Sequence, residues 1–179
     1  MMTTNKKEKL GVLIPGMGSV ASTFICGVLA CNKNLAKPVG SMTQMGSIRL
    51  GKRTEDRTPL IKDFAKTVPM KNLVFGGWDI NDENVYEIAI RSAVLEKNLL
   101  DELKADLEQI RVFKAVFDKN YVRRLNGDWI KKGKNKLDLA NQVIKDIEEF
   151  RNINGTSGNV MIWCGSTEIF MEKSDVHSD

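Results

Sequence analysis

The sequence predicts an α/β fold in which a parallel β-sheet carries helices on its faces. Three observations support this: short apolar runs typical of buried strands recur along the chain, helix-length amphipathic segments separate them, and glycines join the first run to the first helix. Strands that are separated by helix-length crossovers pair in parallel. Each expected strand ends in small or polar residues, and ligands of such sheets bind beyond the carboxyl ends of the strands. We therefore expect one binding site built from three strand ends.

The first strand and helix are expected close to the start of the chain. Leu10–Ile14 is a continuous apolar run, and it leads into the glycines of Gly16–Gly18. Apolar residues then recur at helical spacing as far as Leu29, with Ser19 as the expected N-cap and Asn32–Asn34 as the end of the helix. This order predicts a strand, a glycine turn and a helix.

Residues 36–70 form the least regular segment and are interpreted as an insertion. Prolines and glycines scattered through it argue against one long helix, although Lys62–Thr67 is long enough for a short one. A long irregular loop inside a domain is often functional. Its basic residues favour a solvated surface over a docking site for a phosphorylated ligand; they are Arg49, Lys52, Arg53 and Arg57.

A second buried strand, Leu73–Phe75, is expected to end in the turn Gly76–Asn81. Asn81 is the expected N-cap of the next helix, and because position 84 is asparagine, no capping box is expected there. Apolar residues at helical spacing then predict a single long helix over 85–110, and residues 115–125 fit either a loop or a short helix.

The last elements follow a polar, lysine-rich connector at 129–136, which is interpreted as a solvated loop because it lacks interleaved aromatic residues. Leu137–Phe150 has the pattern of an amphipathic helix, and 154–158 breaks it. Val160–Trp163 is the third expected buried strand, and it ends in the turn Cys164–Thr167.

Composition favours one folded domain over 10–179 behind a polar leader at 1–9. The 179 residues are 42% hydrophobic and 28% charged, with a net charge of +4. This balance is too mild to indicate a nucleic-acid or membrane partner. Three cysteines without a C-x-x-C pair, and one histidine, argue against disulfides and a metal site, so free buried thiols and no metal are expected. The chain has no run of about 18 apolar residues and no secretory signal, which predicts a cytoplasmic protein.

The glycine turn has the pattern of a dinucleotide-binding motif. Residues 16–21 read G-M-G-S-V-A and fit G-x-G-x-x-A between a strand and a helix. The first glycine would make the tight turn, the second would let the backbone approach a diphosphate, and Ala21 would let the helix pack closely. The unpaired amides of the first helical turn would bind the diphosphate, with the hydroxyls of Ser19, Ser22 and Thr23 nearby. The alternative is a structural turn without a ligand.

The motif usually includes an acidic residue at a strand end about 20 residues further on. Residues 36–42 contain no carboxylate, and the next acid at an expected strand end is Asp79. If 36–70 is an insertion, Asp79 can accept hydrogen bonds from an adenosine ribose. The alternative is an aspartate that stabilises a turn or caps a helix. Trp78 and Trp163 are interpreted as packing residues that could also shape a cofactor pocket.

Four stretches in order resemble the N-terminal part of the myo-inositol-phosphate synthase family. They are the glycine turn with V-A-S-T, G-S-I-R-L-G at 46–51, G-G-W-D-I-N at 76–81 and V-M-I-W-C-G-S-T-E at 160–168. The resemblance implies a Rossmann-like domain that binds NAD. It also implies conversion of glucose 6-phosphate to myo-inositol phosphate by oxidation, enolisation, intramolecular aldol closure and reduction, in inositol and phospholipid biosynthesis. Family members form homotetramers.

The resemblance also implies roles for particular residues. Gly16, Gly18, Ser19 and Val20 would line the pyrophosphate, and Asp79 would hold the adenosine ribose. Arg124 corresponds to a family arginine near the cofactor, and the turn beside the nicotinamide and the substrate would be Cys164, Gly165, Ser166 and Thr167. The glycine turn is leaner than in the family, Tyr121 replaces a glutamine, and the last turn keeps only Thr167, which indicates a divergent, bacterial branch.

Family members are more than twice as long as this chain. The resemblance places the catalytic lysines and aspartates, the sheet that forms the tetramer and the last strands of the Rossmann sheet beyond position 179. We therefore expect a sheet that is incomplete at its C-terminus, catalytic residues that are unknown in this chain, and little activity of the chain alone. Two functions stay open: the NAD-binding portion of an inositol-3-phosphate synthase, or a non-catalytic nucleotide-binding module.

Overall fold

The structure, a computed structural model, describes residues 8–65, 67–122 and 124–163. Its centre is a four-stranded sheet in the order β3-β2-β1-β4. The strands are β1 (Leu10–Pro15), β2 (Leu73–Asp79), β3 (Arg111–Lys114) and β4 (Gly158–Met161). Every pair of neighbours is parallel. The predicted α/β fold with a parallel, Rossmann-like sheet is confirmed.

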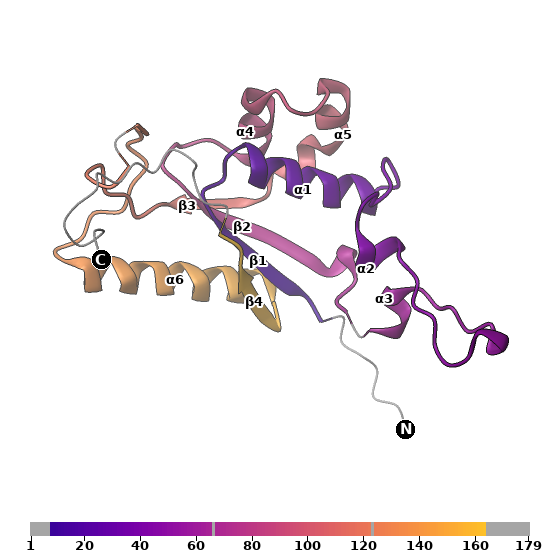
Figure 1. Ribbon diagram of the computed structural model, residues 1–179. Coiled ribbons are helices and arrows are strands. Elements are labelled where there is room, and N and C mark those ends of the chain that lie inside the picture. Colours follow the sequence, from indigo (N-terminus) through magenta and orange to yellow (C-terminus); the bar gives the residue numbers. More distant parts are fainter. Residues whose placement is uncertain (1–7, 66, 123, 164–179) are drawn as a thin grey trace, which may run out of the picture.

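Helices cover both faces of the sheet (Figure 1). On one face lie α1 (Ser19–Asn32), α4 (Val85–Ser92) and α5 (Lys97–Glu108), which pack against one another. On the other face lies α6 (Lys136–Asn154). The chain runs from β1 through α1 to β2, through α4 and α5 to β3, and through α6 to β4. Because all neighbouring strands are parallel, the carboxyl ends of the four strands lie at one edge.

Side chains of β1 alternate between two hydrophobic cores. Val12 and Ile14 face the core shared with α1, α4 and α5, whereas Leu13 faces Phe150 of α6. Leu13 and Ile14 are almost completely buried. Because both faces of β1 are buried, its sequence is a continuous apolar run and does not alternate between apolar and polar residues.

Glycines in β1 and β2 allow close approach at two places. A Cβ atom at Gly76 would lie 2.7 Å from the ring of Phe150, and one at Gly11 would lie 2.6 Å from the same ring. A Cβ atom at Gly77 would lie 2.1 Å from the carbonyl oxygen of Ile14 and 2.9 Å from Sδ of Met17. The missing side chain of Gly76 therefore lets α6 pack closely on the sheet, and that of Gly77 leaves room for the turn after β1.

The expected long helix over 85–110 is wrong, since the structure has α4 and α5 with a break between them. Ala93 has a left-handed backbone conformation (φ 50°) and ends α4. A straight helix of this length would extend about 39 Å, far past the sheet, and could not return the chain to β3. Folding back lets Ile88, Leu100 and Leu103 all face the same core.

Further expectations about helices and strands need correction. β2 continues to Asp79, so most of the expected turn Gly76–Asn81 is strand. The N-cap of α1 is Gly18, not Ser19. The N-cap of α4 is Asn84, not Asn81, and Asn84 forms a capping box with Glu87, which was not expected. β3 was not predicted. β4 covers Gly158–Met161, and in the described part of the chain it is an edge strand whose Val160 and Met161 are exposed, not buried.

The irregular segment 36–70 forms an arm beside the sheet (Figure 1). Two isolated antiparallel bridges, Ser47 with Leu60 and Leu50 with Arg57, join the two sides of the arm. Its short helices and turns are α2 (Met42–Met45), η1 (Arg53–Glu55), α3 (Ile61–Phe64) and η2 (Met70–Asn72). The four basic residues are exposed on this arm. Among the helices that the structure describes, none has the length and apolar character to cross a membrane.

Candidate functional site

The turn after β1 is shaped by two glycines around a buried methionine. Gly16 has φ 82°, a conformation that favours glycine, and its N–H donates to the carbonyl oxygen of Trp78 on β2 at 2.9 Å. Met17 points inward and is almost completely buried, against Gly77. Gly18 is exposed and is the N-cap of α1. The turn is therefore anchored to β2 while its second glycine faces outward.

The start of α1 presents free backbone donors. The first helical hydrogen bond runs from the N–H of Ser22 to the carbonyl oxygen of Gly18, at 2.9 Å. Within the described residues, the N–H groups of Ser19, Val20 and Ala21 meet no acceptor, and no side chain caps the helix. In the part of the chain that the structure describes, no atom lies within 4 Å of a Cβ atom built at Gly18. Free amides at the positive end of the helix, beside open space, fit a diphosphate group.

The side chains of this first turn differ in what they can offer. Ser19 is exposed, as is Val20, with 71% of its surface accessible. Ser22 is buried, and its hydroxyl donates to the carbonyl oxygen of Ser19 at 3.2 Å. The hydroxyl of Ser22, which was expected near the anion, is thus bound to the backbone of its own helix.

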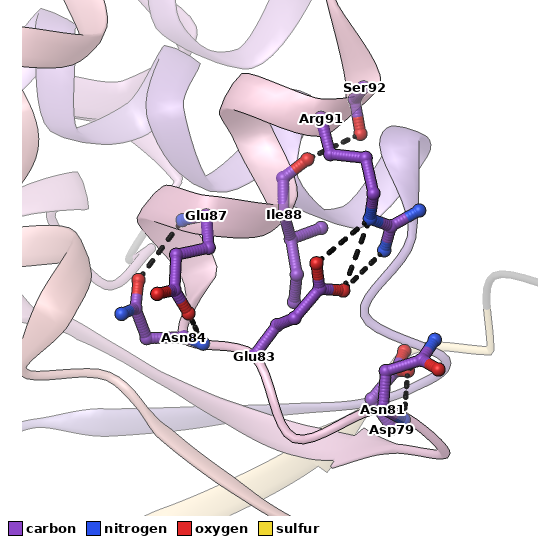
Figure 2. Close-up of polar contacts among 8 residues, drawn as sticks. All are labelled: Asp79, Asn81, Glu83, Asn84, Glu87, Ile88, Arg91 and Ser92. Atoms are coloured by element: carbon purple, nitrogen blue, oxygen red, sulfur yellow. Dashed lines mark hydrogen bonds and ion pairs between the residues drawn. The ribbon is translucent and has the colours of Figure 1, made fainter. Parts of the chain in front are cut away.

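Asp79 ends β2 and lines the same pocket as Gly16 of the glycine turn, and Figure 2 shows it beside Asn81. Its Oδ1 accepts from the backbone N–H of Asn81 at 3.0 Å and from the side-chain amide of Asn81 at 3.3 Å. Its Oδ2 has no hydrogen-bond partner among the residues that the structure describes. The alternative of a turn-stabilising aspartate is thus correct for one oxygen, and the other stays available to a ligand.

The loop after Asp79 is held by contacts at both ends of α4 (Figure 2). Arg91 binds Glu83 at 2.7 Å, and Asn84 and Glu87 exchange the two hydrogen bonds of the capping box. Hydrogen bonding to Glu83 raises the pKa of the Arg91 guanidinium, and the charge of Asp79 adds a smaller effect in the same direction. These contacts fix the loop that carries Asn81, and so fix the carboxylate of Asp79.

A pocket of about 470 Å³ opens at the carboxyl edge of the sheet, between the glycine turn and Asp79. Its walls are mainly apolar, and among the described residues that line it Asp79 is the single ionisable one. The lining residues are Pro15, Gly16, Trp78, Asp79, Ile80, Ala115, Val116, Phe117, Val122, Leu125, Val143, Met161 and Trp163. Gly16 is the residue of the glycine turn that lines the pocket, and the free amides of α1 lie at the same edge of the sheet. An apolar pocket with one carboxylate near free amides suits a nucleotide.

The sequence-predicted residues fall into three groups. Gly16, Gly18, Ser19, Val20 and Asp79 come together at the carboxyl edge of the sheet. Arg124 is exposed and does not line the pocket, although Val122 and Leu125 on either side of it do. The turn residues Cys164, Gly165, Ser166 and Thr167 lie outside the described residues. In the described ranges, no group of three or more potential metal ligands occurs.

Three comparisons with known proteins agree on one family. A family model described as myo-inositol-1-phosphate synthase, that of the NAD-binding domain, matches residues 10–179. Inositol-3-phosphate synthase 1 of Bacteroides thetaiotaomicron is 42% identical over 170 residues, which cover 94% of this chain and 39% of that protein. Inositol-3-phosphate synthase 1 of Plasmodium falciparum is 30% identical over 182 residues, which cover 91% of this chain and 30% of that protein.

A solved structure shows the same fold. It is an inositol-3-phosphate synthase of Caenorhabditis elegans, 24% identical, with a TM-score of 0.78 over 95% of this chain and 37% of that one. The chain therefore spans well under half the length of the proteins it matches.

Proposed function

Because this chain belongs to the myo-inositol-1-phosphate synthase family, we propose that it is the NAD-binding portion of an enzyme that converts glucose 6-phosphate to inositol phosphate. The matched family model is that of the NAD-binding domain, so NAD is the cofactor of this domain. The reaction itself, an isomerisation of the inositol-3-phosphate synthase type, belongs to the proposal, since the chain covers 39% of its 42% identical relative.

The residues of the site fit NAD on an observation independent of the family. The free amides of Ser19, Val20 and Ala21 would bind the diphosphate, and the missing side chain of Gly18 leaves room for it. The free oxygen of Asp79 would accept from a ribose hydroxyl. Trp78 and Phe117 would form the apolar walls. The observation that carries the proposal is that open amides, open space and a free carboxylate oxygen meet at one strand edge.

Bound NAD would supply a hydride acceptor that later returns the hydride to the substrate. Removal of the hydride makes the C–H bond next to the oxidised carbon acidic until the hydride is returned. The described residues of the pocket would bind the cofactor, orient it and exclude water. Asp79 is the single ionisable group among the pocket's lining residues. In the described residues, therefore, the pocket offers no second group to move a proton.

That observation keeps the second function open, a nucleotide-binding module without catalysis. We expect the purified 179-residue chain to bind NAD and to form little or no inositol phosphate from glucose 6-phosphate. Calorimetric titration with NAD, NADP and AMP measures the first property, and detection of inositol phosphate measures the second. Ready turnover by this chain would favour a complete catalyst, and a chain without affinity for NAD would refute the proposal.

Further parts of the proposal rest on the resemblance or on composition alone. They are glucose 6-phosphate as substrate, a homotetramer as the assembly of the whole enzyme, a role in phospholipid biosynthesis and a cytoplasmic location. Arg124 near the cofactor and the turn Cys164–Thr167 beside the nicotinamide also remain proposals, as do the boundaries of the domain at 10–179.

A further inference from the structure

A buried polar cluster lies under the pocket, on the side of the sheet covered by α6. Asp146 of α6 accepts from the indole N–H of Trp78 at 2.7 Å, and the ammonium of Lys131 lies 2.8 Å from Oδ2 and 3.0 Å from Oδ1 of the same carboxylate. Asp146 is 8% exposed and is the one charged residue in the described core. Burying a carboxylate costs free energy unless it is paired, and even a buried pair often adds no net stability. A role for this cluster beyond stability is therefore worth considering.

All three members of this cluster connect directly to the walls of the pocket. The ring of Trp78 lines it, and the carbonyl oxygen of Trp78 holds the N–H of Gly16. The backbone N–H of Lys131 donates to the carbonyl oxygen of Ala115 at 2.8 Å, and Ala115 lines the pocket. Asp146 stands three residues after Val143 on α6, on the same face of the helix, and Val143 also lines the pocket.

We propose that Asp146 is a positioning residue for the dinucleotide: its carboxylate fixes the indole of Trp78 and the Lys131 segment so that the pocket is already formed before NAD enters. This inference rests on the proposed function. Trp78 is clamped from two sides, because its ring also packs on Phe113 with centroids 6.0 Å apart. Preorganised walls spare the ligand the cost of ordering side chains on binding.

The competing explanation is that the cluster serves stability alone by joining α6 to the sheet. The known energetics of buried ion pairs allow an experiment to distinguish positioning of the pocket from stability alone. An apolar pair of similar volume usually keeps or raises stability, whereas removing one charge leaves the other unpaired. A double variant, Asp146→Leu with Lys131→Met, therefore removes both charges together and also the acceptor of the Trp78 indole N–H. The loss of that acceptor is expected to lower the free energy of unfolding of the variant. Under the competing explanation, a folded double variant binds NAD like the wild type.

The experiment compares the wild-type chain, the double variant and a control. The control is Glu149→Gln, because Glu149 also joins α6 to the sheet, through an exposed contact to Arg111 at 3.5 Å. Urea unfolding first establishes that each protein is folded, and calorimetry then gives the Kd for NAD. In parallel, ¹⁵N spectra follow the indole N–H signal of Trp78 and its exchange with water.

Positioning predicts that the folded double variant binds NAD at least tenfold more weakly, with a shifted, faster-exchanging Trp78 indole signal, while Glu149→Gln binds like the wild type. An unchanged Kd in the folded double variant overturns this inference and leaves NAD binding intact. If the wild type itself fails to bind NAD, the proposed function fails, and this inference with it.

If the double variant does not fold, Trp78→Phe takes its place, since phenylalanine keeps an apolar ring and loses the indole donor. Phe117→Leu is its control, because it trims another wall of the pocket and changes no residue of the cluster. A loss of NAD affinity at least tenfold greater in Trp78→Phe than in Phe117→Leu supports the inference, and equal affinities in the two variants overturn it.

Discussion

Replacing Gly18 by alanine separates the ligand-binding role of the glycine turn from a structural one. A Cβ atom at this position would meet nothing within 4 Å, and φ is −87°, which alanine tolerates. Alanine is a poorer N-cap than glycine by up to about 1 kcal/mol. It also stabilises by about 0.4–1 kcal/mol, because it restricts the unfolded chain. The two effects offset each other, so we expect the free energy of unfolding to change by less than about 1 kcal/mol.

Affinity for NAD is expected to fall in the same variant. The methyl group would occupy the space that the diphosphate needs to reach the amides of α1. Overpacking of this kind costs about 1–3 kcal/mol, and since about 1.4 kcal/mol is tenfold in Kd, the Kd should rise roughly 5- to 150-fold. Calorimetry with NAD measures the Kd, and urea unfolding measures the stability.

Gly27→Ala is the matched control on the same helix. Gly27 is exposed, and its added Cβ atom also meets nothing within 4 Å. It lies nine residues further along α1, about 13 Å from the helix start. Alanine there should stabilise the helix by about 1 kcal/mol and leave the Kd for NAD unchanged. If Gly18→Ala binds NAD as tightly as Gly27→Ala does, the assignment of the diphosphate to this turn is refuted.

Three further predictions test other parts of the account. Gly77→Ala should destabilise the fold by about 3 kcal/mol or more, because its Cβ atom would lie 2.1 Å from the backbone oxygen of Ile14. Gly158→Ala is the control and should be nearly neutral, because the nearest neighbour of its Cβ atom would lie 3.9 Å away. Equal midpoints of urea unfolding for the two variants would contradict this packing. Asp79→Asn keeps an oxygen for the turn with Asn81 and removes the charge, so the free energy of unfolding should change by less than about 1 kcal/mol. NAD should bind roughly tenfold more weakly, since hydrogen bonds to charged groups contribute about 1.5–3 kcal/mol. An unchanged Kd would exclude Asp79 from ribose binding. Burial raises the pKa of the Cys26 thiol from 9.0 to about 11. The folded state therefore favours the protonated thiol, and the free energy of unfolding is highest below pH 9 and falls as the pH rises through 11, by at most about 2–3 kcal/mol. Cys26→Ala should remove this part of the pH dependence of urea unfolding, and identical pH profiles of the variant and the wild type would count against it.

The parts of the fold predicted correctly are those whose signal is local. The apolar run of β1, the glycine turn and the helical spacing of α1 and α6 each lie within one stretch of sequence, and the structure has all of them. Gly16 and Gly18 could be assigned to a turn because a strand before them and a helix after them were both evident. Asp79 could be placed at a strand end because it stands in the turn expected after an apolar run, and it is the last residue of β2.

The errors arise where tertiary packing decides. No glycine or proline marks the break at Ala93, and the break exists because α4 and α5 fold back over the same core. β3 has four residues and directly follows a helical pattern, so its alternation is too short to detect. The capping box had a local signal, asparagine at 84 and glutamate at 87, which the earlier Asn81 obscured.

The walls of the pocket could not be predicted in the same way. Phe117, Val122 and Leu125 come from a segment without a regular pattern, and their meeting with Trp78 depends on how β3 pairs with β2. The pairing of Lys131 with Asp146 joins a loop to a helix across the sheet edge, and neither residue has a local signature. Sequence reasoning thus located the anchor points for a nucleotide, and the structure supplied the surface between them.

The central claim is that the first turn of α1 binds the diphosphate of NAD. The most direct measurement is a titration of the ¹⁵N-labelled chain with NAD, followed through the backbone amide signals. The account predicts that the signals of Gly18, Ser19, Val20 and Ala21 shift most, and that those of Ile110 and Ile153, at the opposite edge of the sheet, stay in place. Shifts centred on that opposite edge, or no shift at the start of α1 at saturating NAD, would contradict it.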